Sequence, residues 1–180
     1  MNLIFRLLLV ALSSFRRPRL GPWDESVLRF RVLPTDLDLN FHMNNGRYLT
    51  VMDLGRVDLL LRVGVVRAMR ELRWRGVVAS EMVRFRRPLN VFQHYELRTR
   101  LLCWDERWFF MDHRFTRGGE LMAWGLVKIQ YSSREGRLRP QQVIDATPRA
   151  LQSPPIPPAV VEWMDAEQAL AAGKPAPALA

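Results

Sequence analysis

The chain is poor in cysteine, and the motifs of several enzyme classes are absent. Cys103 is its single cysteine, which excludes an intramolecular disulfide and any Cys-x-x-Cys metal site. There is no glycine-rich phosphate loop, no G-x-S-x-G nucleophile motif, no metal-ligand cluster and no internal repeat. Together these shortages favour a domain that needs no metal or cofactor, and a reducing, cytoplasmic location.

Lysine is also scarce. Only Lys128 and Lys174 occur, so the net charge of +9 is carried almost wholly by arginine. Such a surface favours anionic partners, namely nucleic acid, acidic lipid or a phosphate-bearing molecule such as coenzyme A. A length of 180 residues with 48% hydrophobic residues fits one globular domain with a substantial core.

The stretch from Thr35 to Arg56 concentrates the polar residues that can support chemistry. An asparagine at a helix start accepts a hydrogen bond from the first-turn amides, which carry the positive end of the helix dipole. Asn44 and Asn45 therefore predict a helix N-terminus that can stabilise an oxyanion. The loop before it contains three further candidates, Asp38, Asn40 and His42. A base facing such a dipole is a common arrangement for acyl transfer.

This stretch resembles the signature of hotdog-fold acyl thioesterases of the 4-hydroxybenzoyl-CoA thioesterase type, D-x-D-x-x-x-H-[VM]-N-N-x-x-Y followed by an acidic residue and an arginine. The matching positions are Asp36, Asp38, His42, Asn44, Asn45, Tyr48, Asp53 and Arg56. The resemblance implies hydrolysis of an acyl-CoA or acyl-ACP thioester, with Asp38 as nucleophile or base and with Asn40 and His42 orienting it or a water. It assigns substrate binding to Asn44, Asn45, Gly46 and Tyr48, and implies a homodimer or tetramer with the cleft between subunits.

The D-x-N-x-H core, Asp38 to His42, is also similar to plant acyl-ACP thioesterases, but one feature of those enzymes is missing. A further catalytic Glu or Cys follows the arginine pair of their next strand, where this chain has Pro88 and Leu89. Neither residue can act as acid, base or nucleophile. The mechanism should therefore be closer to that of the small single-hotdog enzymes, although binding of acyl groups without cleavage stays open.

The order of the predicted elements gives the fold class. Alternation over Val27 to Leu33 predicts a half-buried strand, and a helix should run from Asn45 to Val63 and end at Gly64. Four more strands follow, over residues 77–87, 95–104, 108–115 and 121–131, with a hairpin at Gly118-Gly119. This order is typical of an α+β fold with an antiparallel sheet. The resemblance adds the hotdog arrangement, in which a curled five-stranded sheet wraps one long central helix, and Gly55 would let a strand approach that helix.

Three segments are expected: an N-terminal amphipathic helix and linker (1–22), the hotdog domain (23–140) and a proline-rich tail (141–180). The first contains an apolar stripe, Leu3, Ile4, Leu7, Leu8, Ala11, Leu12 and Phe15, too short to cross a bilayer. Arg6 interrupts it, so it is a poor signal peptide. It is either a packing helix or an interfacial membrane anchor backed by Arg16, Arg17 and Arg19. As an anchor, residues 1–20 should be dispensable for turnover of soluble substrate.

The tail should contain a short helix over Ala159 to Ala172, and the last residues, GKPAPALA, should be disordered. Within the domain, Glu81 has the strand parity of Val83 and should face the central helix. It either pairs with an arginine or adds a polar group to the cleft.

Arg84 and Arg86 are either contacts for coenzyme A phosphates or solvated charges near a strand edge. His94 and His113 are interpreted as structural. The alternative function is a non-catalytic protein that binds acyl-CoA, a lipid surface or nucleic acid. Its nucleic-acid form, the less favoured one, rests on the arginine excess and on the aromatic and basic residues of Arg107 to Phe115, which could stack on bases and contact phosphates.

Overall fold

The computed structural model describes residues 3–146 and 151–173. Its strands are β1 (Ser26–Arg31), β2 (Arg75–Phe85), β3 (His94–Trp104), β4 (Phe109–Arg117), β5 (Glu120–Ser133) and β6 (Gly136–Leu138). Its helices are α1 (Leu3–Ser14), α2 (Asn45–Val63), α3 (Val65–Glu71), α4 (Pro140–Asp145) and α5 (Pro158–Ala171), with a 3-10 turn at Pro34–Asp36. The predicted disorder of the C-terminus concerns residues 173–180, of which 174–180 lie outside the described ranges.

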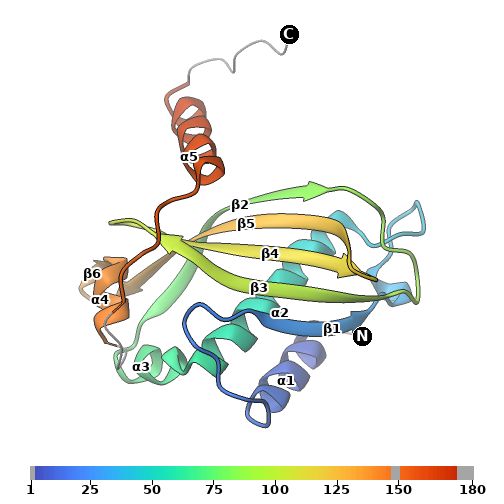
Figure 1. Cartoon of the computed structure of the whole chain (residues 1–180), viewed down its shortest axis with the longest axis horizontal. Helices are drawn as coiled ribbons and strands as arrows, with labels where there is room; N and C mark the ends of the chain where they lie inside the picture. The colour runs from blue at the N-terminus through green and yellow to red at the C-terminus, as the bar shows by residue number, and fades with distance from the viewer. Residues whose placement is uncertain (1–2, 147–150, 174–180) are drawn as a thin grey trace.

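The strands form one antiparallel sheet in the order β1-β3-β4-β5-β2, with β6 pairing to the end of β5 on the edge opposite β2. Figure 1 shows this sheet curling over α2, with α1 below the helix layer and α5 above the opposite face of the sheet. The predicted α+β hotdog fold is confirmed. The sequence did not predict β6 or α4, since three and six residues are too few to show a periodicity.

The predicted central helix is confirmed from Asn45 to Val63. Asn44 caps its start, and Gly64 ends it in the left-handed conformation with a φ of 91°. Most faces of α2 are buried, because the sheet covers one side and α1 packs on another.

Asp58 and Arg62 of α2 form an i,i+4 ion pair at 3.2 Å. Both residues are buried, and Asp58 also accepts hydrogen bonds from Arg17 (3.0 Å) and Ser26 (2.6 Å). The segment that follows α1 covers this side of the helix and supplies Arg17. A buried carboxylate requires such partners.

The apolar stripe predicted for α1 is divided between two faces. Leu3, Leu7 and Val10 pack toward β1 and α2, while a second set of apolar side chains is exposed. The helix therefore packs on the domain, in agreement with the packing-helix alternative. It also exposes apolar side chains on its other face. The exposed set is Ile4, Phe5, Leu8, Leu9, Leu12 and Phe15.

The predicted C-terminal helix is present as α5. Its Val160 and Trp163 are buried against Phe110 and Leu126 on the outer face of the sheet. The proline-rich segment before it therefore leads to a helix that covers part of that face, on the opposite side of the sheet from α2.

Candidate active site

A tight loop places Asp38 next to the start of α2. The Asp38 amide donates to the His42 carbonyl (2.9 Å), and the Phe41 amide donates to the Asp38 carbonyl (3.2 Å). To close this turn, Phe41 adopts a φ of 61°. A left-handed conformation at a bulky residue costs on the order of 1–3 kcal/mol, and such strain is concentrated at functional sites.

The Asp38 carboxylate is oriented from within the loop. Its Oδ1 accepts the Asn40 amide (2.8 Å) and lies 3.4 Å from Nδ1 of His42. The Asp38 side chain is 22% exposed, so it is held but reachable by a substrate. Two of the three predicted catalytic side chains are thus brought together, whereas Asn40 contributes its backbone and leaves its side chain exposed.

The start of α2 faces the same region. The Asn44 side chain accepts the Gly46 amide (2.8 Å), and the Asn44 carbonyl accepts the Arg47 amide (2.8 Å). Among the described residues, the Asn45 amide has no acceptor. Asp38 and Asn44 both line a surface hollow, together with Pro34, Leu37, Leu39, Asn40 and Phe41. A carboxylate and the positive end of a helix therefore open into one shallow depression.

The backbone of Leu89 holds the end of this loop in place. Its carbonyl accepts the Met43 amide (2.8 Å), and the neighbouring Asn90 forms a β-bridge with His42. The Leu89 side chain is fully buried. In the stretch where the resemblance to the plant enzymes implies a catalytic Glu or Cys, this chain thus has a residue that holds the loop by its backbone.

Tyr48 is buried and does not line the hollow. It is 2% exposed, and its ring packs edge-on against Phe85 and Phe115. Burial raises the pKa of Tyr48 to about 12, against a hydrogen bond to the Leu89 backbone that lowers it. The Tyr48 phenol is accordingly neutral at physiological pH. In this structure its burial leaves no room for a substrate to contact it directly.

Glu81 faces α2, as its strand parity predicted, and pairs with an arginine. Its carboxylate accepts a hydrogen bond from Arg56 (3.2 Å), which also pairs with Asp53. Burial raises the pKa of Glu81, and the charge of Arg56 opposes that rise. The internal-pair alternative is confirmed, and this pair belongs to the middle of α2 rather than to the Asp38 loop.

The two candidate arginines of the next strand lie apart from Asp38. Side chains along β2 point alternately to the two faces of the sheet. Glu81 and Val83 face α2, so Arg84 lies with Met82 on the outer face. Arg86 is exposed just after the strand, and its amide donates to the Met122 carbonyl (2.9 Å). Neither arginine lines the hollow. Arg86 is the nearer of the two, along the chain, to Leu89, which holds the Asp38 loop.

The stretch on which the nucleic-acid alternative rests, Arg107 to Phe115, keeps its phenylalanines inside the protein. Phe109, Phe110 and Phe115 are buried in the core, and His113 is fully buried with its Nδ1 3.0 Å from the Thr99 hydroxyl. At the surface the stretch presents Arg107, Trp108 and Arg114, and Arg107 lies over the Trp108 ring. The interleaved aromatic pattern therefore reflects a half-buried strand.

Arg6 is a buried residue near this site that sequence reasoning missed. It forms an ion pair with Asp36, two residues before Asp38. The available signal was the charge itself, because an arginine inside an apolar helix needs a buried partner. No group of side chains suited to hold a metal ion occurs within residues 3–146 and 151–173.

A curled sheet around one helix, with a D-x-D loop opening beside the N-terminus of that helix, defines a thioesterase-like hotdog protein. The sequence independently identifies the family, because the profile of the Thioesterase-like superfamily matches residues 32–164. The chain belongs to this superfamily.

Curated relatives agree with that assignment. Over 136 residues the chain is 38% identical to Protein THEM6 of Xenopus laevis, a match that covers 74% of this chain and 64% of the relative. It is 34% identical to Protein THEM6 of Danio rerio, over 73% of this chain and 64% of the relative. A probable thioesterase of Saccharomyces cerevisiae is 27% identical, over 62% of this chain and 50% of that protein. The matches thus span less than two thirds of these relatives.

Solved structures share the fold. A probable thioesterase of Escherichia coli superposes with a TM-score of 0.62 at 18% identity, covering 68% of this chain and 98% of the other. A gentisyl-coenzyme A thioesterase superposes with a TM-score of 0.57 at 22% identity, covering 67% and 98%. At these identities the likeness establishes the architecture alone.

Proposed function

We propose that this protein hydrolyses acyl-CoA thioesters at the hollow that contains Asp38. The observation that carries the proposal is that the Asp38 carboxylate and the N-terminus of α2 open into the same depression. The names of structural neighbours support the substrate class, since they include a gentisyl-coenzyme A thioesterase and a 1,4-dihydroxy-2-naphthoyl-CoA thioesterase of Synechocystis.

The chemistry follows from these two groups. The thioester carbonyl oxygen accepts hydrogen bonds from the first-turn amides, with the Asn45 amide as the donor available, and this stabilises the oxyanion. Asp38 then either attacks the carbonyl carbon, so that water later hydrolyses the acyl-enzyme anhydride, or takes a proton from an attacking water. Both routes require the carboxylate and release the thiol of coenzyme A.

Apolar side chains beside Asp38 suit the acyl group. Leu39 is 95% exposed and Phe41 is 78% exposed, although both are large and apolar. Exposed apolar groups at the rim of a polar site are typical of a surface that is covered by a ligand or a partner. Arg86, close along the chain to the Leu89 anchor, is the candidate for a contact with coenzyme A phosphates.

We further propose that two copies of the chain pair through β2. Within the described residues this strand pairs with β5 on one edge only, and the residues from Arg75 to Ala79 are all exposed. A long free edge with exposed Val77 and Val78 is a ready template for a second strand. Pairing there would place a partner copy beside the end of β2, which leads to the Leu89 anchor of the Asp38 loop.

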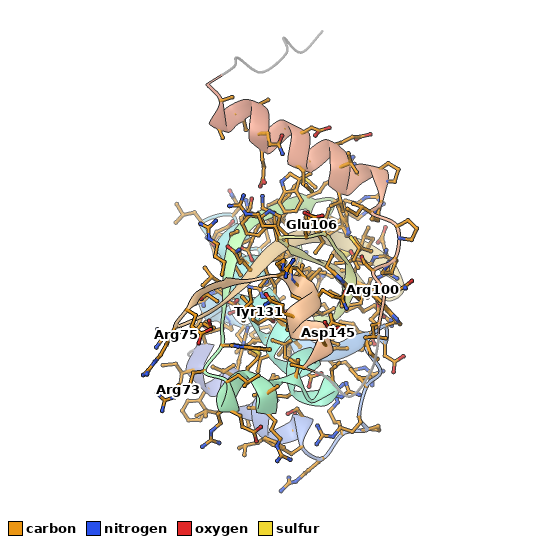
Figure 2. All side chains as sticks on the ribbon, turned by 90° about the vertical axis from the view of Figure 1, so that its left-hand side faces the viewer. Arg73, Arg75, Arg100, Glu106, Tyr131 and Asp145 are labelled. Carbon is orange, nitrogen blue, oxygen red and sulfur yellow. The ribbon has the colours of Figure 1, made fainter. Side chains whose placement is uncertain are left out.

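We also propose that α1 contacts a lipid surface. Its five exposed apolar side chains and that of Phe15, just after the helix, face outward. No helix within the described residues is long and apolar enough to cross a bilayer. Between α1 and α3 a groove is lined by Phe15, Arg19, Arg67 and Arg70 among others. Figure 2 shows Arg73 and Arg75 toward the same end of the molecule as α1, opposite α5. Apolar side chains flanked by arginines suit an anionic headgroup layer.

A hydrolysis screen tests the main proposal. Acyl-CoA esters of increasing chain length, and acyl-ACP as a second arm, are offered to the protein with thiol release as the readout. Asp38→Asn should lower kcat by about a hundredfold or more while acyl-CoA affinity is retained, because asparagine preserves the shape of the hollow. Parent-like turnover by Asp38→Asn would overturn the assignment of Asp38.

A further inference from the structure

The one charged side chain of α1 points into the protein. Arg6 and Asp36 have 5% and 1% of their side-chain areas exposed, and Nη2 of Arg6 donates to Oδ2 of Asp36 across 2.5 Å. The two residues come from separate segments, the N-terminal helix and the 3-10 turn that precedes the Asp38 loop. On the face of α1 opposite its exposed apolar side chains, Arg6 therefore forms an ion pair with Asp36, next to the candidate active site.

Asp36 connects the parts of that site. Its Oδ2 also accepts the Leu33 amide (3.0 Å), and its carbonyl accepts the amide of the helix cap, Asn44 (2.8 Å). Its position therefore fixes both where the loop begins and where the helix cap lies. Asp38 is two residues further along the same backbone.

Arg6 is the close cationic partner of the Asp36 carboxylate. The nearest alternative is Arg47, whose Nε lies 3.6 Å from Oδ1 and so beyond hydrogen-bond distance, and that oxygen has no hydrogen-bond partner among the described residues. A carboxylate buried this deeply is strongly unfavourable when its partner is removed. Without Arg6 the turn would have to move to expose Asp36 to water.

We propose that Arg6 is a positioning residue for thioester hydrolysis: through Asp36 it sets the placement of Asp38 against the N-terminus of α2. The inference rests on the proposed function. It changes what is expected of the N-terminal segment, since residues 1–20 then belong to the active centre and turnover of soluble substrate depends on them. Arg17, which donates to the buried Asp58, gives the same segment a second internal contact.

The test compares Arg6→Met, Arg6→Lys and a matched control, Arg134→Met, in the full chain. Arg134 is an exposed arginine in the turn between β5 and β6. Thermal unfolding first establishes that each variant is folded at the assay temperature. Values of kcat and KM for a soluble acyl-CoA are then measured, together with hydrogen–deuterium exchange of the peptide that covers residues 33–47.

In Arg6→Met we expect kcat to fall about tenfold or more, because small misplacements of a reacting group are costly, with KM changed less than about twofold. Exchange over 33–47 should rise while exchange in the β3–β4 hairpin stays as in the parent. Arg6→Lys should recover part of kcat, and Arg134→Met should match the parent.

A folded Arg6→Met protein with parent-like kcat and parent-like exchange over 33–47 would overturn the inference. So would a fall in kcat that only follows the folded fraction, since that denotes a stability role alone. If the parent itself hydrolyses none of the acyl-CoA esters, the proposed function fails, and the exchange of residues 33–47 decides by itself whether Arg6 positions the loop.

Discussion

Gly55 of α2 lies directly against Thr99 of β3, so closely that a Cβ atom at Gly55 would stand 2.2 Å from the Thr99 hydroxyl oxygen and 2.8 Å from a Leu97 methyl carbon. The helix can approach the sheet here only because position 55 has no side chain. Gly55→Ala should therefore destabilise the protein by about 1–3 kcal/mol through overpacking, although alanine is the better helix former. Urea unfolding measures this free energy.

The control for that substitution is Leu49→Ala, at an exposed position of the same helix. It should change the free energy of unfolding by less than about 0.5 kcal/mol, as is usual at surface sites. Gly55→Ala with stability equal to or above the parent would show that the helix and sheet can separate at this point without cost.

Pairing through β2 predicts an assembly that a charge can disrupt. The parent should sediment as at least a dimer at micromolar concentration. Val77→Glu adds a charge to the exposed side of the edge strand and should shift the protein toward monomer. Leu170→Glu makes the same change at an exposed position of α5 and should leave sedimentation unchanged. A parent that is monomeric with full activity would refute the pairing.

Lipid contact through α1 predicts a loss of binding without a loss of turnover. Leu8→Ser/Leu12→Ser removes two exposed apolar side chains and should lower recovery on phosphatidylserine-containing vesicles several-fold. Turnover of a soluble acyl-CoA should stay as in the parent, since neither residue contacts Asp36. Point substitutions are preferable to deletion of residues 1–20, because deletion also removes Arg6 and Arg17. Parent protein that ignores these vesicles at low salt would make α1 a packing element only.

His113 predicts a pH dependence of stability. Complete burial, reinforced by the charge of Arg56, holds the pKa of His113 well below its usual range, whereas in the unfolded chain it titrates near ~6.5. Below that pH the unfolded state binds the proton and the folded state does not, so stability is lost as pH falls. The gap in unfolding free energy between parent and His113→Gln should change by up to about 1.4 kcal/mol per pH unit below ~6.5. Urea unfolding at pH 7.5, 6.5 and 5.5 checks this, and a constant gap would contradict it.

Local patterns in the sequence were sufficient to predict the order of the helices and strands and to locate the candidate site along the chain. The alternation of Val27 to Leu33 and the capping residues Asn44 and Gly64 act within a few neighbours, so they predicted β1 and α2 closely. The same holds for Gly118-Gly119, where both glycines have positive φ in the predicted hairpin. The D-x-D-x-x-x-H-M-N-N stretch located the loop because its chemistry depends on residues adjacent along the chain.

Contacts between distant segments were decided only by the tertiary structure. Arg6 lies 30 residues from Asp36, and nothing in its own helix shows where its charge goes. Leu89 anchors the Asp38 loop through its carbonyl, a group that every residue possesses and that no sequence pattern marks. Burial of Asp58 with Arg62 depended on the segment after α1 covering them. Sequence patterns report the periodicity of one element, whereas the partner of a buried charge is set by how separate elements pack together.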